Sequence, residues 1–165
     1  MRAIARRLKH PVLLWDNYPV NDLSMSDELH IGPLRGRDPE LPSTVYGYLN
    51  NPLLQEELSF IPLSTCFDYA ANPRAYDPEL SWTRVITHCY GRDALPYWGA
   101  MRRFCDESRR AKRGKRAPRW SHAERVAFGA ACSYWEEQKN ERWAREIRPW
   151  YDAMKRAAVK GYRTE

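Results

Sequence analysis

Apolar positions in the first part of the chain change their spacing from one short segment to the next. Residues 2–9 carry apolar side chains at helical spacing, which predicts a helix that ends before Pro11. The continuous apolar run 12–15 is typical of a short strand buried on both faces, as in a parallel sheet. Glycine, proline and polar residues then dominate residues 23–42 and predict a series of turns.

A second helical stretch, a strand and a loop are predicted to follow. A helix is predicted from about Thr44 to an interruption at Pro52. Asn51 is predicted to be the N-cap of a second helical segment over residues 53–58, with Pro52 in its first turn. The apolar run 60–63 predicts a second buried strand, and a polar loop is expected over residues 64–78. This alternation of helices, buried strands and loops is typical of the α/β class.

The second half of the chain has the pattern of long helices. Ser121 and Glu124 have the spacing of a capping box, which marks the start of a helix. The predicted helices span about 78–90, 95–111, 121–139 and 141–160, the last with a break at Pro149. Four aromatic residues near the C-terminus fall close to helical spacing and are predicted to lie in the core of a bundle: Trp135, Trp143, Trp150 and Tyr151.

Proline content changes near residue 80. Nine of the 12 prolines lie within residues 1–78, where short elements are joined by turns. We therefore predict two domains, an α/β part over residues 1–80 and an all-α part over residues 81–165. Two strands cannot close a sheet, and their free edges need partners, so the first part is expected to belong to something larger.

The net charge of +6 is unevenly placed. Residues 1–80 carry 7 basic and 11 acidic side chains, whereas residues 81–165 carry 20 basic and 10 acidic. Residues 102–119 alone hold 9 basic and 2 acidic side chains. Such a field attracts nucleic acid or another polyanion. The simpler interpretation is a solvated helix face followed by a basic linker over residues 114–119, and no DNA- or RNA-binding motif accompanies it.

Composition and cysteine spacing exclude several classes of protein. The chain has 165 residues, 43% of them hydrophobic and 29% charged, which is typical of a globular domain. No apolar run approaches the ~18 residues of a membrane span, and no secretory signal pattern follows the arginine-rich N-terminus. The cysteines form no C-x-x-C pair and no histidine stands at ligand spacing, so we predict no metal and no cofactor. They are expected to be buried small hydrophobes in a reducing compartment.

The densest group of polar side chains directly follows the first predicted strand. Residues 15–22 supply two carboxylates, two carboxamides and two aromatic rings. In α/β folds, side chains from several loops converge where the strands end. Carboxamides and carboxylates can bind sugar hydroxyls, and aromatic rings can cover the apolar face of a sugar. The alternative is that Asp16, Asn17 and Asn21 only cap turns, and composition does not separate the two interpretations.

Several segments together resemble one enzyme family. The strings LLWDNYPVND, LHIGPLRGRDPEL, GYLNNPLLQEELSFIPLSTCFDYAANP and YDPELSW occur in order over roughly residues 10–85. They resemble the end of the catalytic domain of the O-GlcNAcase-like β-N-acetylglucosaminidases, glycoside hydrolase family 84. Residues 86–165 resemble the helical domain that follows it, but in general character only.

The resemblance implies a fold and a set of sugar contacts. It implies the last two β/α units of a TIM (β/α)8 barrel followed by a helical bundle. Asn17 and Asp22 match residues that contact the hydroxyls of bound N-acetylglucosamine, with Asp22 on the O4/O6 side. Asn51 matches a further hydroxyl contact, and Trp15 matches an aromatic residue lining the pocket. No contact role is carried onto Asp16, Asn21 or Asp68, which also lie in matching segments.

The resemblance also implies a mechanism that this chain does not complete. In the family, the acetamido oxygen of the sugar attacks the anomeric carbon, and two adjacent aspartates on an earlier strand assist. This sequence contains no Asp-Asp dipeptide, so no catalytic residue is expected in this chain and it is expected to be inactive alone. Its expected function is to contribute sugar-hydroxyl contacts to a β-N-acetylglucosaminidase. The alternative is a non-catalytic helical module that binds a polyanion or nucleic acid through residues 102–119.

The expected partners follow from the same resemblance. The substrate would be a glycan or glycoprotein containing N-acetylglucosamine, and a missing upstream chain or self-association would complete the sheet. Three explanations of the short barrel stay open: a truncated gene, which we favour, a split enzyme, and a remnant retained for its helices. No membrane association and no compartment are predicted.

Overall fold

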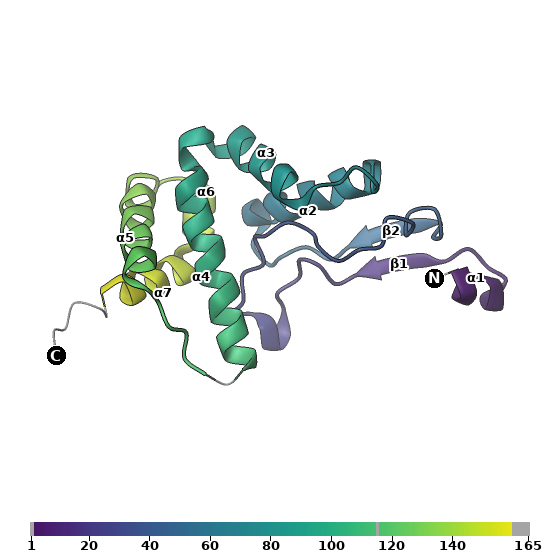
Figure 1. The fold of residues 1–165 in the computed structure, drawn as a ribbon, viewed down its shortest axis with the longest axis horizontal. Coiled ribbons are helices and arrows are strands. Elements are labelled where there is room, and N and C mark those ends of the chain that lie inside the picture. Colours follow the sequence, from purple (N-terminus) through teal and green to yellow (C-terminus); the bar gives the residue numbers. More distant parts are fainter. Residues whose placement is uncertain (1, 115, 160–165) are drawn as a thin grey trace.

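The molecule is elongated, with a pair of strands towards one end and a cluster of helices at the other (Figure 1). The computed structural model describes residues 2–114 and 116–159. None of the helices in these residues combines the length and the apolar content of a membrane span. In chain order the elements are α1 (Arg2–Leu8), β1 (Leu13–Asp16), the 3-10 helix η1 (Leu23–Met25), β2 (Gly47–Asn50), α2 (Glu56–Ala71), α3 (Pro78–Tyr90), the 3-10 helix η2 (Arg92–Ala94), α4 (Leu95–Arg113), α5 (His122–Glu137), α6 (Arg142–Glu146) and α7 (Arg148–Val159).

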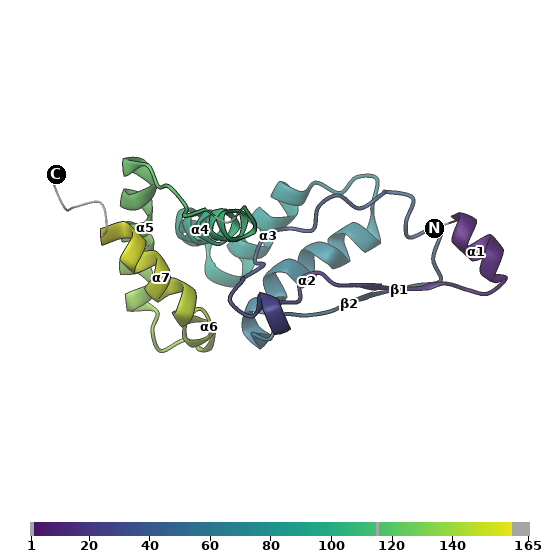
Figure 2. The same ribbon diagram turned by 90° about the horizontal axis from the view of Figure 1, so that it is seen from below.

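The strands β1 and β2 form a parallel pair, although β2 is not the strand that the sequence predicts as the partner of β1. Leu13 lies opposite Gly47, and Asp16 lies opposite Asn50. Helix α2 runs along one face of this pair (Figure 2). On that face, Tyr48 of β2 packs against a small core that contains Cys66 of α2.

The other face of the strand pair is exposed. Its side chains are Leu13, Trp15 and Leu49, which are 59%, 62% and 43% exposed. Successive side chains of a strand point to opposite faces, so α2 shields only every second side chain from solvent. The prediction that the first strand is buried on both faces is therefore wrong for this chain.

The elements predicted between residues 44 and 71 are largely wrong. The helix expected from Thr44 is instead strand β2, because Gly47–Asn50 pairs with β1. The strand expected over residues 60–63 and much of the polar loop expected after it belong to α2. Pro62 lies inside α2 and leaves the helix without one backbone N–H donor. Its carbonyl accepts a hydrogen bond from the Thr65 hydroxyl at 2.7 Å.

The start of α2 is capped by a residue from the other end of the chain. Its N-cap residue is Gln55, whose side chain makes no capping hydrogen bond, so the predicted cap at Asn51 is also wrong. Instead the carboxylate of Glu146, at the end of α6, accepts the backbone N–H groups of Glu57 and Leu58 at 3.2 and 3.1 Å. A carboxylate at this position satisfies free helix donors and interacts favourably with the helix dipole.

The helices of the second half form where the sequence predicts them. Helices α3 and α4 begin as expected, α5 begins with the capping box of Ser121 and Glu124, and a break separates α6 from α7. The predicted end of the last helix at Lys160 lies outside the described residues. Trp98 is fully buried at the centre of this part, with its ring centroid 5.7 Å from that of Trp135. The four aromatic residues predicted for the core are confirmed: Trp135, Trp150 and Tyr151 are buried, and Trp143 packs against them.

Side chains on both sides of residue 80 share one core. Leu58 and Ile61 of α2 belong to the same apolar cluster as Trp98. Two indole N–H groups add hydrogen bonds between the parts: Trp82 donates to the Ile31 carbonyl at 2.8 Å, and Trp150 donates to the Asp27 carbonyl at 2.9 Å. The helices therefore support the loops beside the strands, and the domain division at residue 80 stays a prediction.

The cysteines follow their prediction with one exception. Cys66, Cys105 and Cys132 are buried and unbonded, as small apolar side chains. Burial raises the pKa of the Cys66 thiol to about 12. Cys89 is exposed on α3, so its predicted burial is wrong.

An ion pair between half-buried Arg37 and the buried Asp16 carboxylate fixes the end of β1. Arg37 donates two hydrogen bonds to the Asp16 carboxylate, both at 2.6 Å, and the Tyr48 hydroxyl donates a third at 2.6 Å. Burial raises the pKa of Asp16, but the hydrogen bonds from Arg37 and Tyr48 outweigh it and hold the pKa below its ordinary value of 3.8. This network joins both strands to the segment between them.

Replacing Glu146 tests the cap on α2. We expect Glu146→Ala to lower the free energy of unfolding by about 1–2 kcal/mol, because two helix donors lose their acceptor. Hydrogen exchange at the Glu57 and Leu58 amides should accelerate. Glu137→Ala, at the exposed end of α5, is the control and should change neither quantity. Unchanged protection of these two amides in Glu146→Ala would show that the cap contributes nothing.

The Asp16 network predicts a pH dependence. Because the pKa of Asp16 is lowered by folding, its contribution to stability is present above the unfolded value and is lost as the pH falls through the folded value. We expect Asp16→Asn to cost about 2 kcal/mol near neutral pH and clearly less at about pH 3. Urea unfolding at both pH values measures this, with the exposed Asp93→Asn as control. An equal cost at both pH values would contradict the prediction.

Candidate functional site

The loops that follow β1 and β2 are joined by their backbones. The Asn51 N–H donates to the Asp16 carbonyl at 2.9 Å, and the Asn51 carbonyl accepts from the Val20 N–H at 3.0 Å. The Asn50 side chain adds a hydrogen bond to the Tyr18 carbonyl at 3.2 Å. The carboxyl ends of the two strands are thus held against each other, as the prediction of converging loops requires.

Asn21 joins the same loops through its side chain. It is completely buried, and its Oδ1 accepts from the Leu54 N–H at 2.9 Å. Its Nδ2 donates to the Glu28 carbonyl at 2.9 Å and to Gln55 Oε1 at 2.8 Å. The side-chain atoms of Asn21 and Asp16 are thus bonded within the chain, to partners distant in sequence rather than to a local turn.

Three of the four predicted site residues converge at the surface. Asn17 Oδ1 accepts from the Trp15 indole N–H at 2.9 Å and from Asn51 Nδ2 at 3.5 Å. Trp15 and Asn17 are exposed, and Asn51 is half-buried. This small group, which we call the Asn17–Asn51 group, consists of Trp15, Asn17 and Asn51.

No hydrogen bond among the described residues joins Asp22, the fourth predicted residue, to this group. Its backbone carbonyl accepts from the Met25 N–H at 2.8 Å and so forms the turn of η1. Its half-buried carboxylate has no partner among the described residues. Because Asp22 follows the clamped residue Asn21, its backbone is held next to the loop that carries Asn51.

The segment 28–32 is hydrogen-bonded to residues 18–20 of the loop that follows β1. His30 Nδ1 lies 3.0 and 3.1 Å from the carbonyl oxygens of Pro19 and Val20, and its Nε2 lies 3.1 Å from the Glu28 carboxylate. The Tyr18 hydroxyl donates to the Gly32 carbonyl at 2.7 Å, and burial raises the Tyr18 pKa. The peptide between Tyr18 and Pro19 is cis.

Three supporting residues were not among the predicted site residues: His30, Arg37 and Tyr48. All of them lie in the segments that carry the family resemblance, and this is the one signal that could have indicated them. Their partners are distant in sequence, so local spacing does not reveal the contacts. Asp68, another residue without a predicted role, accepts from the Ser81 hydroxyl at 2.5 Å and thus joins α2 to α3.

The chemistry of the site is that of hydrogen bonding to a polar ligand. Two carboxamides, one unpartnered carboxylate and an exposed indole ring can each serve sugar hydroxyls or a sugar face. Within the described residues, no three histidine, cysteine or acidic side chains are placed to hold a metal ion.

Comparisons with known proteins indicate the family of this chain. A family model described as β-N-acetylglucosaminidase matches residues 1–106. Among solved structures, an O-GlcNAc hydrolase mutant from Thermobaculum terrenum is 29% identical with a TM-score of 0.80, and the match covers 94% of this chain and 38% of that one. CpGH84B is 19% identical with a TM-score of 0.53, and the match covers 96% of this chain and 29% of that one.

The matches cover a larger share of this chain than of the solved structures. Almost all of this chain is aligned, whereas it spans about two fifths or less of the proteins it matches. The likeness to CpGH84B concerns the fold alone. The family match covers well over half of the sequence, including the strand pair and the Asn17–Asn51 group. The chain therefore belongs to the β-N-acetylglucosaminidase family, and it is like the C-terminal region of the glycoside hydrolase family 84 enzymes.

Proposed function

We propose that this chain contributes the sugar-hydroxyl side of a β-N-acetylglucosaminidase pocket. The observation that carries the proposal is the Asn17–Asn51 group at the carboxyl ends of two parallel strands. Asp22, which follows the clamped residue Asn21, adds a carboxylate without a partner among the described residues. In this proposal Asn17, Asp22 and Asn51 bind hydroxyls of a terminal N-acetylglucosamine, and Trp15 covers part of the ring. The substrate is a glycan or glycoprotein that carries this sugar.

In the proposed architecture, β1 and β2 are the last two strands of a (β/α)8 barrel, and the helices after residue 80 form the domain that follows it. The parallel register and the position of α2 on one face support this. The exposed apolar face of Leu13, Trp15 and Leu49 supports it further, because a barrel would cover this face with other strands. An upstream chain supplies those strands, or self-association covers the face.

The proposed mechanism is substrate-assisted. The acetamido oxygen of the substrate attacks the anomeric carbon, while a carboxylate pair orients the acetamide and provides the general acid and base. That pair must come from another polypeptide segment, because no two aspartates are adjacent in this sequence. The role of this chain is to hold the sugar so that the reaction can take place.

The alternative function, binding of an extended polyanion through residues 102–119, has less support. Most basic side chains of α4 already face carboxylates: Arg102 pairs with Glu79, Arg103 with Glu124, Arg110 with Glu107, Lys112 with Asp27, and Arg113 with Glu28. These pairs neutralise much of the field that a polyanion would follow.

A chimera tests the proposal. In it, this chain replaces the matched region of the Thermobaculum terrenum O-GlcNAc hydrolase, and hydrolysis of 4-methylumbelliferyl N-acetylglucosaminide is measured. We expect activity in the chimera and none in this chain alone. Asp22→Ala in the chimera should lower kcat/KM by about 100-fold, since roughly 3 kcal/mol of charge-assisted hydrogen bonding is lost.

The control variant is Asp93→Ala, an exposed aspartate in η2 that should leave kcat/KM unchanged. A folded chimera without activity would contradict the proposal. So would a chimera in which Asp22→Ala behaves like Asp93→Ala. Hydrolysis by this chain alone would show that the catalytic carboxylates lie within it.

A further inference from the structure

A cavity lies between α4 and the segment 30–37. Its volume is about 270 Å³, and Tyr18 and His30 form part of its wall. Five arginines and one aspartate also line it: Arg35, Arg37, Arg102, Arg109, Arg110 and Asp106. The basic stretch of the sequence and the GPLRGR segment thus meet in one place.

Several guanidinium donors in this cavity are uncommitted. Arg102 donates from both terminal nitrogens to Glu79, at 2.9 and 2.7 Å, which leaves its Nε beside Gly32. Arg109 uses one nitrogen on Asp106 at 3.2 Å, and Arg110 uses one on Glu107 at 2.6 Å. Each guanidinium carries five N–H donors, so Arg102, Arg109 and Arg110 keep donors for a further acceptor.

Two of the arginines are already fixed in place. The Arg102 side chain is 17% exposed, and its guanidinium lies 4.8 Å from the ring centroid of Trp82. Arg37 is held by the Asp16 carboxylate. Fixed guanidinium groups lose little conformational entropy when they bind, and their planar forks suit oxyanions.

Burial also acts on the charge of the cavity. It lowers the pKa of Arg102, although the nearby Asp106 carboxylate acts in the opposite direction. A second anion would offset this burial cost. Asp106 pairs with Arg109, and Arg35 shares the Glu79 carboxylate with Arg102. The cavity therefore offers unused N–H donors rather than unpaired cations.

We propose that this cavity binds a phosphate-type oxyanion, held by Arg35, Arg102, Arg109 and Arg110. The free N–H donors supply its hydrogen bonds, and Arg37 contributes positive charge from its fixed position. The ligand is a free phosphate or the phosphoryl group of a phosphorylated sugar, since Tyr18 in the cavity wall is the residue that follows Asn17 in the chain. Only the sugar source rests on the proposed function.

Calorimetric titration of the chain with inorganic phosphate tests this, with chloride replacing phosphate at constant ionic strength as the reference. We expect saturable binding that Arg109→Gln weakens by about tenfold or more, which corresponds to ~1.4 kcal/mol. The matched control is Arg103→Gln, which loses an ion pair on the same helix but does not line the cavity. It should bind like the wild type.

If Arg109→Gln does not fold, Arg110→Gln, with its exposed side chain, replaces it and should show the same direction of change. Absence of saturable binding would overturn the proposal, as would equal weakening by Arg103→Gln. A second arm uses N-acetylglucosamine 6-phosphate. Tighter binding than inorganic phosphate, lost in Asn17→Ala, assigns the phosphoryl group to a sugar. Equal binding of both ligands assigns the site to free phosphate and leaves the proposed function untouched.

Discussion

The backbone of Asn51 holds the two loops of the site together. The Asn51 N–H donates a hydrogen bond to the last residue of β1, and the Asn51 carbonyl accepts one from the loop that follows β1. Polar backbone groups of the two loops are therefore paired with each other. The parallel register of β1 and β2 makes this possible, because it brings both carboxyl ends to the same edge. The side chains of Asn17 and Asn51 are then free to face outwards as a pair.

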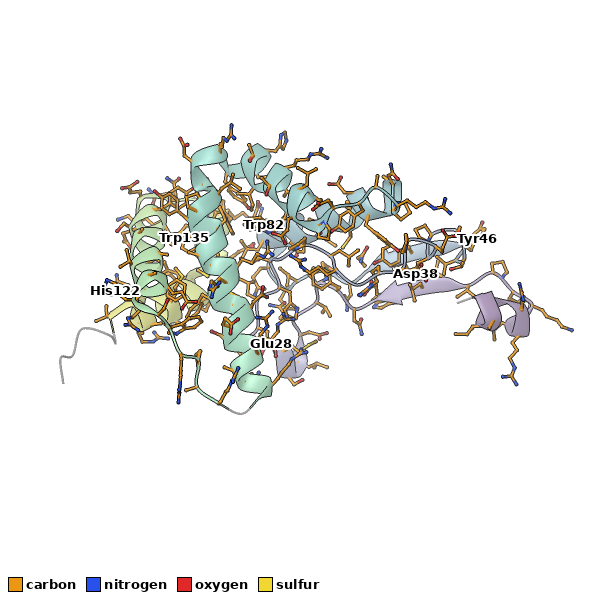
Figure 3. All side chains as sticks on the ribbon, in the orientation of Figure 1. Glu28, Asp38, Tyr46, Trp82, His122 and Trp135 are labelled. Atoms are coloured by element: carbon orange, nitrogen blue, oxygen red, sulfur yellow. The ribbon has the colours of Figure 1, made fainter. Side chains whose placement is uncertain are left out.

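The rest of the fold keeps this arrangement in place. Asp16, Arg37 and Tyr48 lock the strands from the covered face, and Asn21 fastens the loops from within. The helical part acts on the same region, since Glu146 caps α2 and Glu28 lies beside the end of α4 (Figure 3). Removing the helices would therefore expose the supports of the site as well as their own core.

One face of the structure is not used by the chain itself. Leu13, Trp15 and Leu49 are exposed on the strands, and Tyr46 is exposed on the turn that leads into β2, at the end of the molecule opposite α5 (Figure 3). Apolar side chains at alternate positions of paired strands are typical of a surface that another layer covers. This is the physical reason to expect a larger assembly around the site.

The sequence was sufficient to predict the elements whose signals are local. The capping box at Ser121, the strand after Pro11 and the long helices are of this kind. It failed between residues 44 and 71, because β2 forms only against β1 and the start of α2 depends on Glu146, almost 90 residues away. Helix α2 also continues past Pro62, because tertiary packing overrides the low helix propensity of proline.

The candidate site was predicted in the same uneven way. The resemblance indicated Trp15, Asn17 and Asn51, which the structure brings together, and Asp22, which makes no hydrogen bond to them among the described residues. His30, Arg37 and Tyr48 were missed because each acts through a contact across the fold, not through a pattern along the chain. A composition of amides and carboxylates does not distinguish a ligand contact from a clamp such as Asn21.

A crystal structure of the active chimera with N-acetylglucosamine bound tests the central claim most directly. The account predicts that side-chain atoms of Asn17, Asp22 and Asn51 lie within about 3.2 Å of sugar hydroxyls, with the Trp15 ring against the sugar. Sugar density held by other residues, with the Asn17–Asn51 group still closed on itself, would contradict it.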